Sequence, residues 1–162
     1  MPASKPTTPA LEWFAQPDPA AGRDGAGLRF SCTLCGNCCS GPEGYVLLTS
    51  TEIDALAARL RLSRQDFLDQ YTHMTGEGRS LKEKTSAFGR DCIFLDREKV
   101  PGKAVCGVYE DRPTQCRTWP FWPSVIKSKS TWERAKRVCP GMDKGQKHDL
   151  VQIRIARDAI NI

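Results

Sequence analysis

Four cysteines stand within eight residues of this chain, in the sequence CTLCGNCC from Cys32 to Cys39. Two thiols separated by two residues can turn toward one centre, because the tight turn between them aims both sulfurs at the same point. Cys32, Cys35 and Cys38 all have this spacing and could chelate one centre together. The turn-forming sequence GPEG follows at residues 41–44, so the run predicts a metal site on a loop.

The same spacing occurs in iron-sulfur proteins. Bacterial-type ferredoxins bind a cluster with C-x2-C-x2-C and a distant Cys followed by Pro, and this chain has Cys139-Pro140. The pattern therefore favours a [4Fe-4S] cluster. All-thiolate tetrahedral sites also suit zinc, so the ligand type leaves zinc open. A paired zinc ribbon would show C-x2-C twice, whereas the later cysteines here are isolated.

The chain contains eight cysteines. Eight thiolates suffice for two four-ligand sites or for one larger polynuclear site. Neighbouring side chains of an extended backbone point apart, so the adjacent Cys38 and Cys39 are expected to serve different centres. The predicted ligands are Cys32, Cys35, Cys38 and Cys139 at one centre and Cys39, Cys92, Cys106 and Cys116 at the other.

Other residues that could act as ligands or bases have simpler interpretations. The two histidines are His73, predicted at a helix end, and His148, in a Lys-rich polar stretch. Both are expected to be surface or capping residues. Asp91 and Glu110 could act as bases, but solvation in loops or pairing with Arg112 is the favoured interpretation.

The net charge is positive, with 24 Lys and Arg against 19 Asp and Glu, a formal +5. Basic residues are scattered apart from residues 127–137 and 144–147, which gives little support for nucleic acid as a partner. A zinc or iron-sulfur centre held by four thiolates carries about −2, so basic residues are expected near the cysteines as compensation.

The N-terminal residues help to predict the cellular compartment of the protein. Residues 1–24 are polar and rich in Pro and Ala, without the apolar segment of a secretory signal. No apolar run approaches the roughly 18 residues of a membrane-spanning helix. We therefore expect a cytoplasmic protein without a membrane partner, whose thiols bind metal. A disulfide framework stays open for a chain whose signal peptide has been removed.

Helix signals are local and clear. Thr49 and Glu52 have the spacing of a capping box, and an apolar stripe follows over residues 53–60. Ser63 starts a second helix by the same logic, and residues 149–160 predict a C-terminal helix. The predicted fold class is small α+β: an irregular single domain organised by cysteines and metal, with short strands, two helices in the N-terminal half and a C-terminal helix.

Strands are predicted to be short. Residues 96–102 are expected to form a hairpin loop that brings Cys92 and Cys106 near two paired strands, so that both could face one site. The predicted strand segments are residues 45–48, 81–85, 93–95 and 104–109, and Cys92 is expected to open the strand at 93–95.

The domain organisation follows from composition. The hydrophobic class reaches 40% but counts cysteine and many alanines, so a thin apolar core is expected. Residues 1–27 are predicted to be a flexible tail in which Trp13 and Phe14 make a local contact or dock on the domain. Residues 28–142 form the predicted cysteine-cluster domain, and residues 143–162 a helical extension.

Taken together, these motifs resemble the YkgJ family of cysteine-cluster proteins, whose defining domain is described as zinc- or iron-chelating. The resemblance runs from about Phe30 to Gly141. It is carried by CTLCGNCC at 32–39, Leu48-Thr49 before the helix with Glu52, CIFL at 92–95, CGVYE at 106–110, Arg112-Pro113, Cys116-Arg117, Pro120-Phe121 and Cys139-Pro140. It implies metal binding through the eight cysteines and no particular reaction.

Two functions are consistent with these features. In the first, a metal-binding module holds an iron-sulfur cluster or zinc in a structural or redox role and works through a protein partner. In the second, the chain is a metal-dependent enzyme, because flagellin lysine methylases resemble the same domain. A deep pocket lined by Tyr109, Arg112, Arg117 and Trp119 would favour the enzyme. We favour the module, since no nucleotide-binding or triad motif is present.

Overall fold

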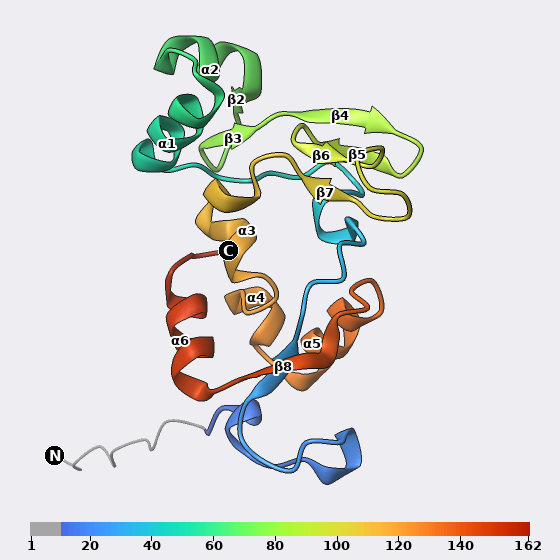
Figure 1. The fold of residues 1–162 in the computed structure, drawn as a ribbon. Coiled ribbons are helices and arrows are strands. Elements are labelled where there is room, and N and C mark those ends of the chain that lie inside the picture. Colours follow the sequence, from blue (N-terminus) through green and yellow to red (C-terminus); the bar gives the residue numbers. More distant parts are fainter. Residues whose placement is uncertain (1–10) are drawn as a thin grey trace, which may run out of the picture.

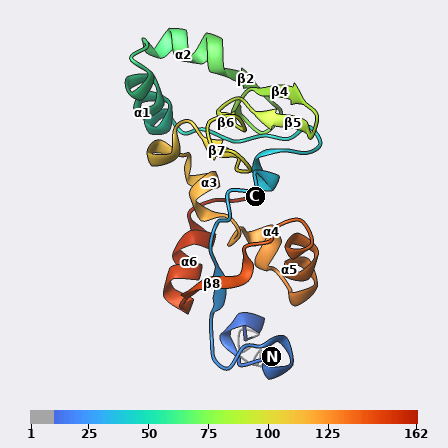
Figure 2. The ribbon, with the colours of Figure 1, turned by 45° about the vertical axis from the view of Figure 1, so that its right-hand side comes forward.

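The computed structural model describes residues 11–162 (Figure 1). Most of its buried apolar side chains form two separate clusters. The helices that contribute to them, within residues 50–71 for one and 123–158 for the other, lie in different halves of the molecule in Figures 1 and 2. The Phe67 core contains Ile53, Leu56, Ala57, Phe67, Leu81, Phe94 and Val108. The Trp132 core contains Phe14, Leu28, Phe121, Val125, Ile126, Trp132, Cys139, Met142 and Ile153. The single thin core expected from composition is thus divided in two.

Two helices cover the Phe67 core, α1 (Ser50–Leu60) and α2 (Arg64–Tyr71). The predicted capping box of α1 is confirmed: the Thr49 hydroxyl accepts from the backbone N–H of Glu52, and the Glu52 carboxylate accepts from that of Thr49. At the start of α2, the Ser63 hydroxyl accepts from the backbone N–H of Asp66. Both helices therefore begin where the local signals place them.

Strands are short and antiparallel, and within residues 11–162 they form four separate two-stranded sheets. The hairpin β6–β7 confirms the loop predicted near residues 96–102 and pairs Leu95 with Cys106. The pairs are β1 (Leu28–Phe30) with β8 (Met142–His148), β2 (Thr72–Met74) with β3 (Arg79–Leu81), β4 (Glu83–Ser86) with β5 (Gly89–Cys92), and β6 (Leu95–Asp96) with β7 (Val105–Cys106).

Two strand predictions need correction. Cys92 ends β5 instead of opening a strand, because a tight turn at Gly89, with φ of 108°, pairs β5 back on β4. Residues 45–48 form only one isolated bridge, between Leu47 and Ser80. Two of their backbone N–H groups instead donate to side chains, that of Val46 to Ser80 and that of Leu47 to Gln115.

Helices α4 (Pro123–Ile126), α5 (Lys129–Lys136) and α6 (Leu150–Asp158) contribute side chains to the Trp132 core. The short helix α3 (Thr114–Thr118) precedes them in the chain. The predicted C-terminal helix is confirmed as α6, capped by Asp149. Neither α5 nor β8 was predicted, since charged residues mask their apolar positions. None of the helices in residues 11–162 is both long and apolar enough to cross a membrane.

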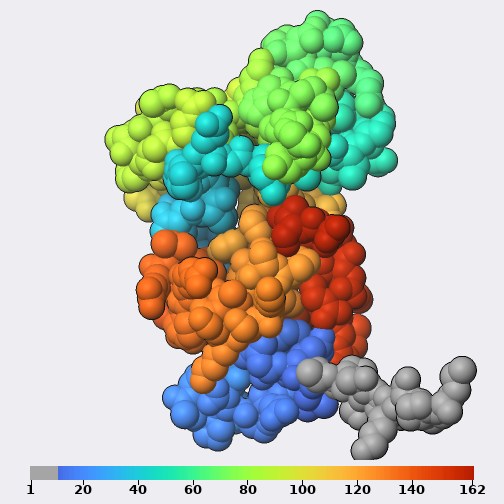
Figure 3. All heavy atoms as spheres, turned by 180° about the vertical axis from the view of Figure 1, so that it is seen from behind, coloured from blue at the N-terminus to red at the C-terminus, as the bar shows by residue number. Residues whose placement is uncertain are grey.

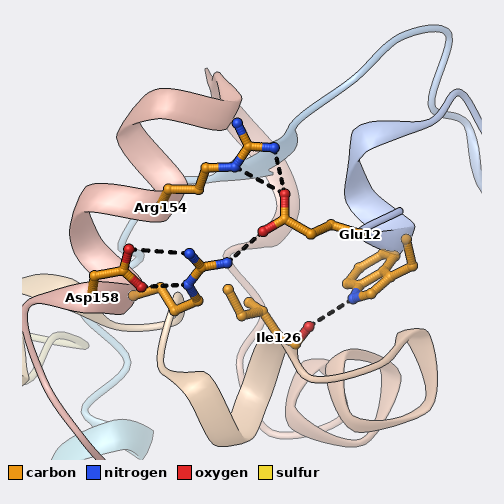
Figure 4. Close-up of polar contacts among 6 residues, drawn as sticks. Glu12, Ile126, Arg154 and Asp158 are labelled. Atoms are coloured by element: carbon orange, nitrogen blue, oxygen red, sulfur yellow. Dashed lines mark hydrogen bonds and ion pairs between the residues drawn. The ribbon is translucent and has the colours of Figure 1, made fainter. Parts of the chain in front are cut away.

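The N-terminal segment differs from the flexible tail predicted for residues 1–27. Residues 1–10 of that prediction lie outside the described residues, but Phe14 is only 2% exposed and belongs to the Trp132 core. The Trp13 indole N–H donates to the carbonyl of Ile126 at 2.8 Å, and Glu12 accepts from Arg154 of α6 at 2.6 Å (Figure 4). Two adjacent aromatic residues outweigh the polar composition around them.

Short 3-10 turns complete the chain: η1 (Trp13–Ala15), η2 (Pro19–Ala21), η3 (Asn37–Cys39) and η4 (Tyr109–Asp111). Seen from behind in Figure 3, the cyan segment around η3 lies where the green upper part meets the orange lower part. The cysteine run is therefore located between the two cores.

Candidate metal centre

A cavity of about 110 Å³ lies between the two cores. Its walls include residues of the Phe67 core, such as Phe94 and Val108, and aromatic residues packed on the Trp132 core, such as Trp119 and Trp122. Six of the eight predicted cysteines line it: Cys32, Cys38, Cys39, Cys92, Cys106 and Cys116.

The cysteine loop, residues 32–39, folds through two left-handed residues, Leu34 with φ of 57° and Gly36 with φ of 76°. It is attached to the β6–β7 hairpin, because the backbone N–H of Ala104 donates to the carbonyl of Leu34 at 2.8 Å. The last residues of η3 are Cys38 and Cys39, so this turn presents both thiols to the cavity.

Three other elements supply the remaining lining cysteines. Cys92 is the last residue of β5, Cys106 the last residue of β7, and Cys116 lies in the middle of α3. The prediction that Cys92 and Cys106 face one site is confirmed, because both line the same cavity.

Cys35 and Cys139 lie next to this group without lining the cavity. Burial raises the pKa of Cys139, and the nearby thiols of Cys38 and Cys35 raise it further. The Trp119 indole N–H points to the Cys139 sulfur at 3.5 Å. The structure thus gathers the eight predicted cysteines at one region, all of them as free thiols.

Thiol pKa values reflect this crowding. Burial raises the pKa of Cys92 to about 11, and it raises that of Cys116 as well, with a further contribution from Cys92 and Cys106. The sulfurs of Cys38 and Cys39 lie 3.7 Å apart. A hydrogen bond from the Cys39 thiol lowers the pKa of Cys38 to about 7, and the same contact raises that of Cys39.

Basic side chains accompany the thiols, as expected for charge compensation. Arg112 stacks on the Tyr109 ring, 3.6 Å from its centroid, and its charge favours the thiolate forms of Cys38, Cys106 and Cys116. Arg112 is therefore a fixed positive charge in the cavity wall.

Burial aside, several thiols raise the pKa of their neighbours. Cys106 raises the pKa of Cys92, and Cys92 and Cys106 both raise that of Cys116. Cys38 raises the pKa of Cys39, Cys106, Cys116 and Cys139. Cys38 therefore lies close to thiols of both predicted centres, and the assignment of ligands to centres stays a prediction.

The sulfurs surround a cavity but do not converge on one point. Within residues 11–162, no three Cys, His, Asp or Glu side chains already form a group that could hold a metal ion. Four sulfurs around zinc stand only about 2.3 Å from the metal. A single zinc ion would therefore need these thiols to move inward.

The histidines and acids lie elsewhere. His73 is in β2 and not at a helix end, and His148 contacts the carbonyl of Phe30 at 3.1 Å. Asp91 pairs with Arg97 at 2.9 Å, which corrects the expected pairing with Arg112. The reason is geometric, since β5 and the loop after β6 bring Asp91 and Arg97 together.

Aromatic residues form part of the cavity wall beside the thiols. Trp119 and Trp122 meet edge to face with ring centroids 4.9 Å apart. Tyr109, Arg112 and Trp119 line the cavity, whereas Arg117, predicted with them, is not among the lining residues. The two large indole rings cover one side of the cavity, whereas Cys32 and Cys38 are exposed to solvent.

Sequence reasoning missed two polar residues near the site, Gln115 and Arg97. The Gln115 amide bonds the backbone of both Tyr45 and Leu47, which holds residues 45–47 at the cavity wall. No local pattern marks Gln115, because its partners lie about 70 residues away.

A cavity lined by clustered thiols, in a small α+β fold with little other regular structure, defines a cysteine-cluster protein. The family model CxxCxxCC, described as "Putative zinc- or iron-chelating domain", matches residues 31–140, more than half of the chain. The chain belongs to this family, as the resemblance of its motifs predicted. No solved structure matches the chain.

Proposed function

We propose that this zinc- or iron-chelating domain holds an iron-sulfur cluster, most simply [4Fe-4S], in a structural or redox role. One observation carries the proposal: six thiols line a single cavity of about 110 Å³. A mononuclear zinc site uses four ligands and encloses its ion tightly. More thiols than zinc needs, around a larger space, favour a polynuclear centre.

The arrangement of the thiols supports this choice. The six that line the cavity come from four segments of the chain: the cysteine loop, β5, β7 and α3. The donor set fits as well, because cysteine thiolates are the usual ligands of iron-sulfur clusters. The C-x2-C-x2-C spacing with Cys139-Pro140 points the same way.

The chain's own residues have defined roles in this proposal. The eight cysteines supply thiolates, Arg112 offsets their negative charge, and Trp119 and Trp122 cover one side of the cavity. A bound cluster would supply one-electron redox chemistry or a structural crosslink. A reducing compartment such as the cytoplasm suits eight free thiols, and we propose that the module serves a protein partner.

Anaerobic purification with metal and acid-labile sulfide analysis tests the proposal directly. We expect brown protein with visible absorption and about equal amounts of iron and sulfide. Colourless protein that contains zinc and no sulfide would overturn the proposal of an iron-sulfur cluster. The assignment to the zinc- or iron-chelating family would be unaffected.

Substitution of ligands gives a second test. Cys116→Ser and Cys139→Ser should each lower the iron content and the unfolding temperature, because metal affinity is part of the folding free energy. His73→Ala serves as the control and should keep the full metal content, since His73 lies in β2 away from the cavity lining. Loss of metal in His73→Ala would contradict the proposed ligand set.

A second candidate function has one observation in its favour. Tyr109, Arg112 and Trp119 stand beside the thiols in the cavity wall, as expected for a metal-dependent enzyme related to flagellin lysine methylases. The cavity is the thiol site itself, however, and a bound cluster would fill space that a substrate needs. The module is therefore the better supported function.

A further inference from the structure

Arg97 lies directly behind the cysteine loop, where the chain leaves β6. Its guanidinium forms a two-pronged pair with Asp91, with distances of 2.9 Å from Nε and 3.1 Å from Nη2. The same Nη2 donates to the Ser40 hydroxyl at 2.5 Å. The Asp91 side chain is only 2% exposed and that of Arg97 23% exposed, so this pair is largely removed from solvent.

These contacts join two cysteine-bearing segments that are distant in sequence. Ser40 follows Cys39, and its hydroxyl donates to the carbonyl of Gly36 within the cysteine loop at 2.9 Å. Asp91 precedes Cys92 at the end of β5. One guanidinium therefore holds the loop against β5, with a planar geometry that fits two acceptors at once.

Arg97 also places a positive charge close to the sulfurs. A Cβ built on Gly36 would lie 3.4 Å from Nη1 of Arg97, which shows how closely the guanidinium approaches the loop. The thiols of Cys39 and Cys35 are near enough to favour its charged form. Arg97 and Arg112 are thus two separate sources of positive charge at the thiols.

We propose that Arg97 is a positioning residue of the cysteine centre, which holds the cysteine loop on β5 and raises the reduction potential of the bound cluster. This inference rests on the proposed iron-sulfur function. A reduced cluster carries one more negative charge, so a fixed cation nearby stabilises the reduced form. Arg97 contacts no cysteine directly and acts through Ser40, Asp91 and its charge.

Four variants separate the tether from the charge. Arg97→Gln removes both, and Arg97→Lys keeps the charge but loses the planar fork. Ser40→Ala leaves Arg97 in place and removes the link to the loop, together with the bond from Ser40 to the Gly36 carbonyl. Arg64→Gln is the matched control, because Arg64 also pairs with a carboxylate, that of Asp54, but on the exposed face of α1 and α2.

The first measurement is the cluster's reduction potential, by voltammetry of the purified holoprotein. We expect Arg97→Gln to shift the ratio of reduced to oxidised cluster tenfold toward the oxidised form, which is ~59 mV for one electron. Arg97→Lys, Ser40→Ala and Arg64→Gln should stay near the wild type. An unchanged potential in Arg97→Gln would overturn the electrostatic role.

The second measurement needs no cluster: amide hydrogen exchange of residues 36–41 in the metal-free protein. Arg97→Gln, Arg97→Lys and Ser40→Ala should all exchange faster there than the wild type, and Arg64→Gln should not. Iron affinity should fall about 10-fold to 100-fold in Arg97→Gln, the usual effect of losing a residue that orients ligands. Wild-type exchange in all three variants would overturn the tether.

The outcomes distinguish this inference from the proposed function. If the wild type binds zinc alone, the proposed cluster and the proposed effect of Arg97 on its reduction potential are both wrong. The hydrogen-exchange measurement then still tests whether Arg97 holds the cysteine loop on β5. If Arg97→Gln does not fold, hydrogen exchange in Arg97→Lys and Ser40→Ala tests the role of Arg97 in holding the loop. The reduction potentials of Arg97→Lys and of Arg97→Met, which is uncharged and nearly as long, then test the role of its charge.

Discussion

Gly36 is the residue on which the shape of the cysteine loop depends most. Its φ of 76° is in the left-handed region, and an added Cβ would meet the Cβ of Ala104 at 2.6 Å. Backbone conformation and lack of space therefore both require glycine here. Through this close approach the loop rests on the β6–β7 hairpin and directs its thiols to the cavity.

Gly36→Ala is expected to lower the metal content and to cost at least about 1 kcal/mol of stability. Gly102→Ala is a matched control, since Gly102 has a similar φ of 73° but nothing within 4 Å of an added Cβ. Urea unfolding together with iron analysis measures both effects. Equal losses in the two variants would show that backbone strain alone, and not the contact with Ala104, matters at Gly36.

At the scale of elements, the N-terminal segment is an integral part of the Trp132 core. Phe14 fills the core, Trp13 bonds the end of α4, and Glu12 binds α6 through Arg154 and Arg157 (Figure 4). This segment lies outside the family match over residues 31–140. The domain matched by the family model therefore packs here against residues outside the match.

Phe14→Ala should destabilise the protein by about 3–5 kcal/mol, the usual cost of deleting a buried phenylalanine side chain. Leu11→Ala is the control, because Leu11 is 67% exposed and should change stability by less than about 0.5 kcal/mol. Denaturant unfolding at constant metal occupancy measures the difference. A small effect of Phe14→Ala would mean that η1 contributes little to the core.

The Glu12 contact should make stability depend on pH. Hydrogen bonds from Arg154 lower the pKa of Glu12 below its ordinary 4.5, with Arg157 adding to the effect. A lowered pKa in the folded state means that the stabilisation is complete above pH 4.5 and is lost as the pH falls through the lowered value.

Glu12→Gln should therefore melt at a lower temperature than the wild type at pH 7, and the difference should shrink in acid. Thermal unfolding of both proteins between pH 7 and pH 3 measures it, with Glu77→Gln, an exposed position in the β2–β3 turn, as the control. A difference that does not change with pH would exclude charge as its cause.

At the scale of the whole molecule, the thiol cavity connects two small cores. Cys139 belongs to the Trp132 core, whereas Cys92 and Cys106 pack against the Phe67 core. A centre bound by cysteines of both groups would crosslink the two. Part of the stability of this small protein would then come from metal ligation, in addition to apolar burial.

Metal removal should consequently loosen the junction more than either core. In the metal-free protein we expect a lower unfolding temperature and faster hydrogen exchange, concentrated in residues 31–40 and 104–118 around the cavity. Anaerobic reconstitution should restore both properties. Equal protection with and without metal would show that the cores hold each other without the centre.

Local features could be predicted from the amino-acid sequence alone: the capped helices α1, α2 and α6, the β6–β7 hairpin and the eight candidate ligands. These depend on neighbouring residues, so they can be recognised without the fold. The family could also be recognised from the sequence, since each of its motifs is a short run of neighbouring residues.

Long-range features became visible only in the fold: which thiols share a cavity, the contact of Arg97 with the cysteine loop, and the pairing of β1 with β8. The fold also placed Phe14 and Ile153, far apart in sequence, in one core. Such contacts join residues that are far apart in the sequence, so local sequence patterns do not predict them. They form because buried apolar surface and polar groups must find partners, wherever in the sequence those partners lie.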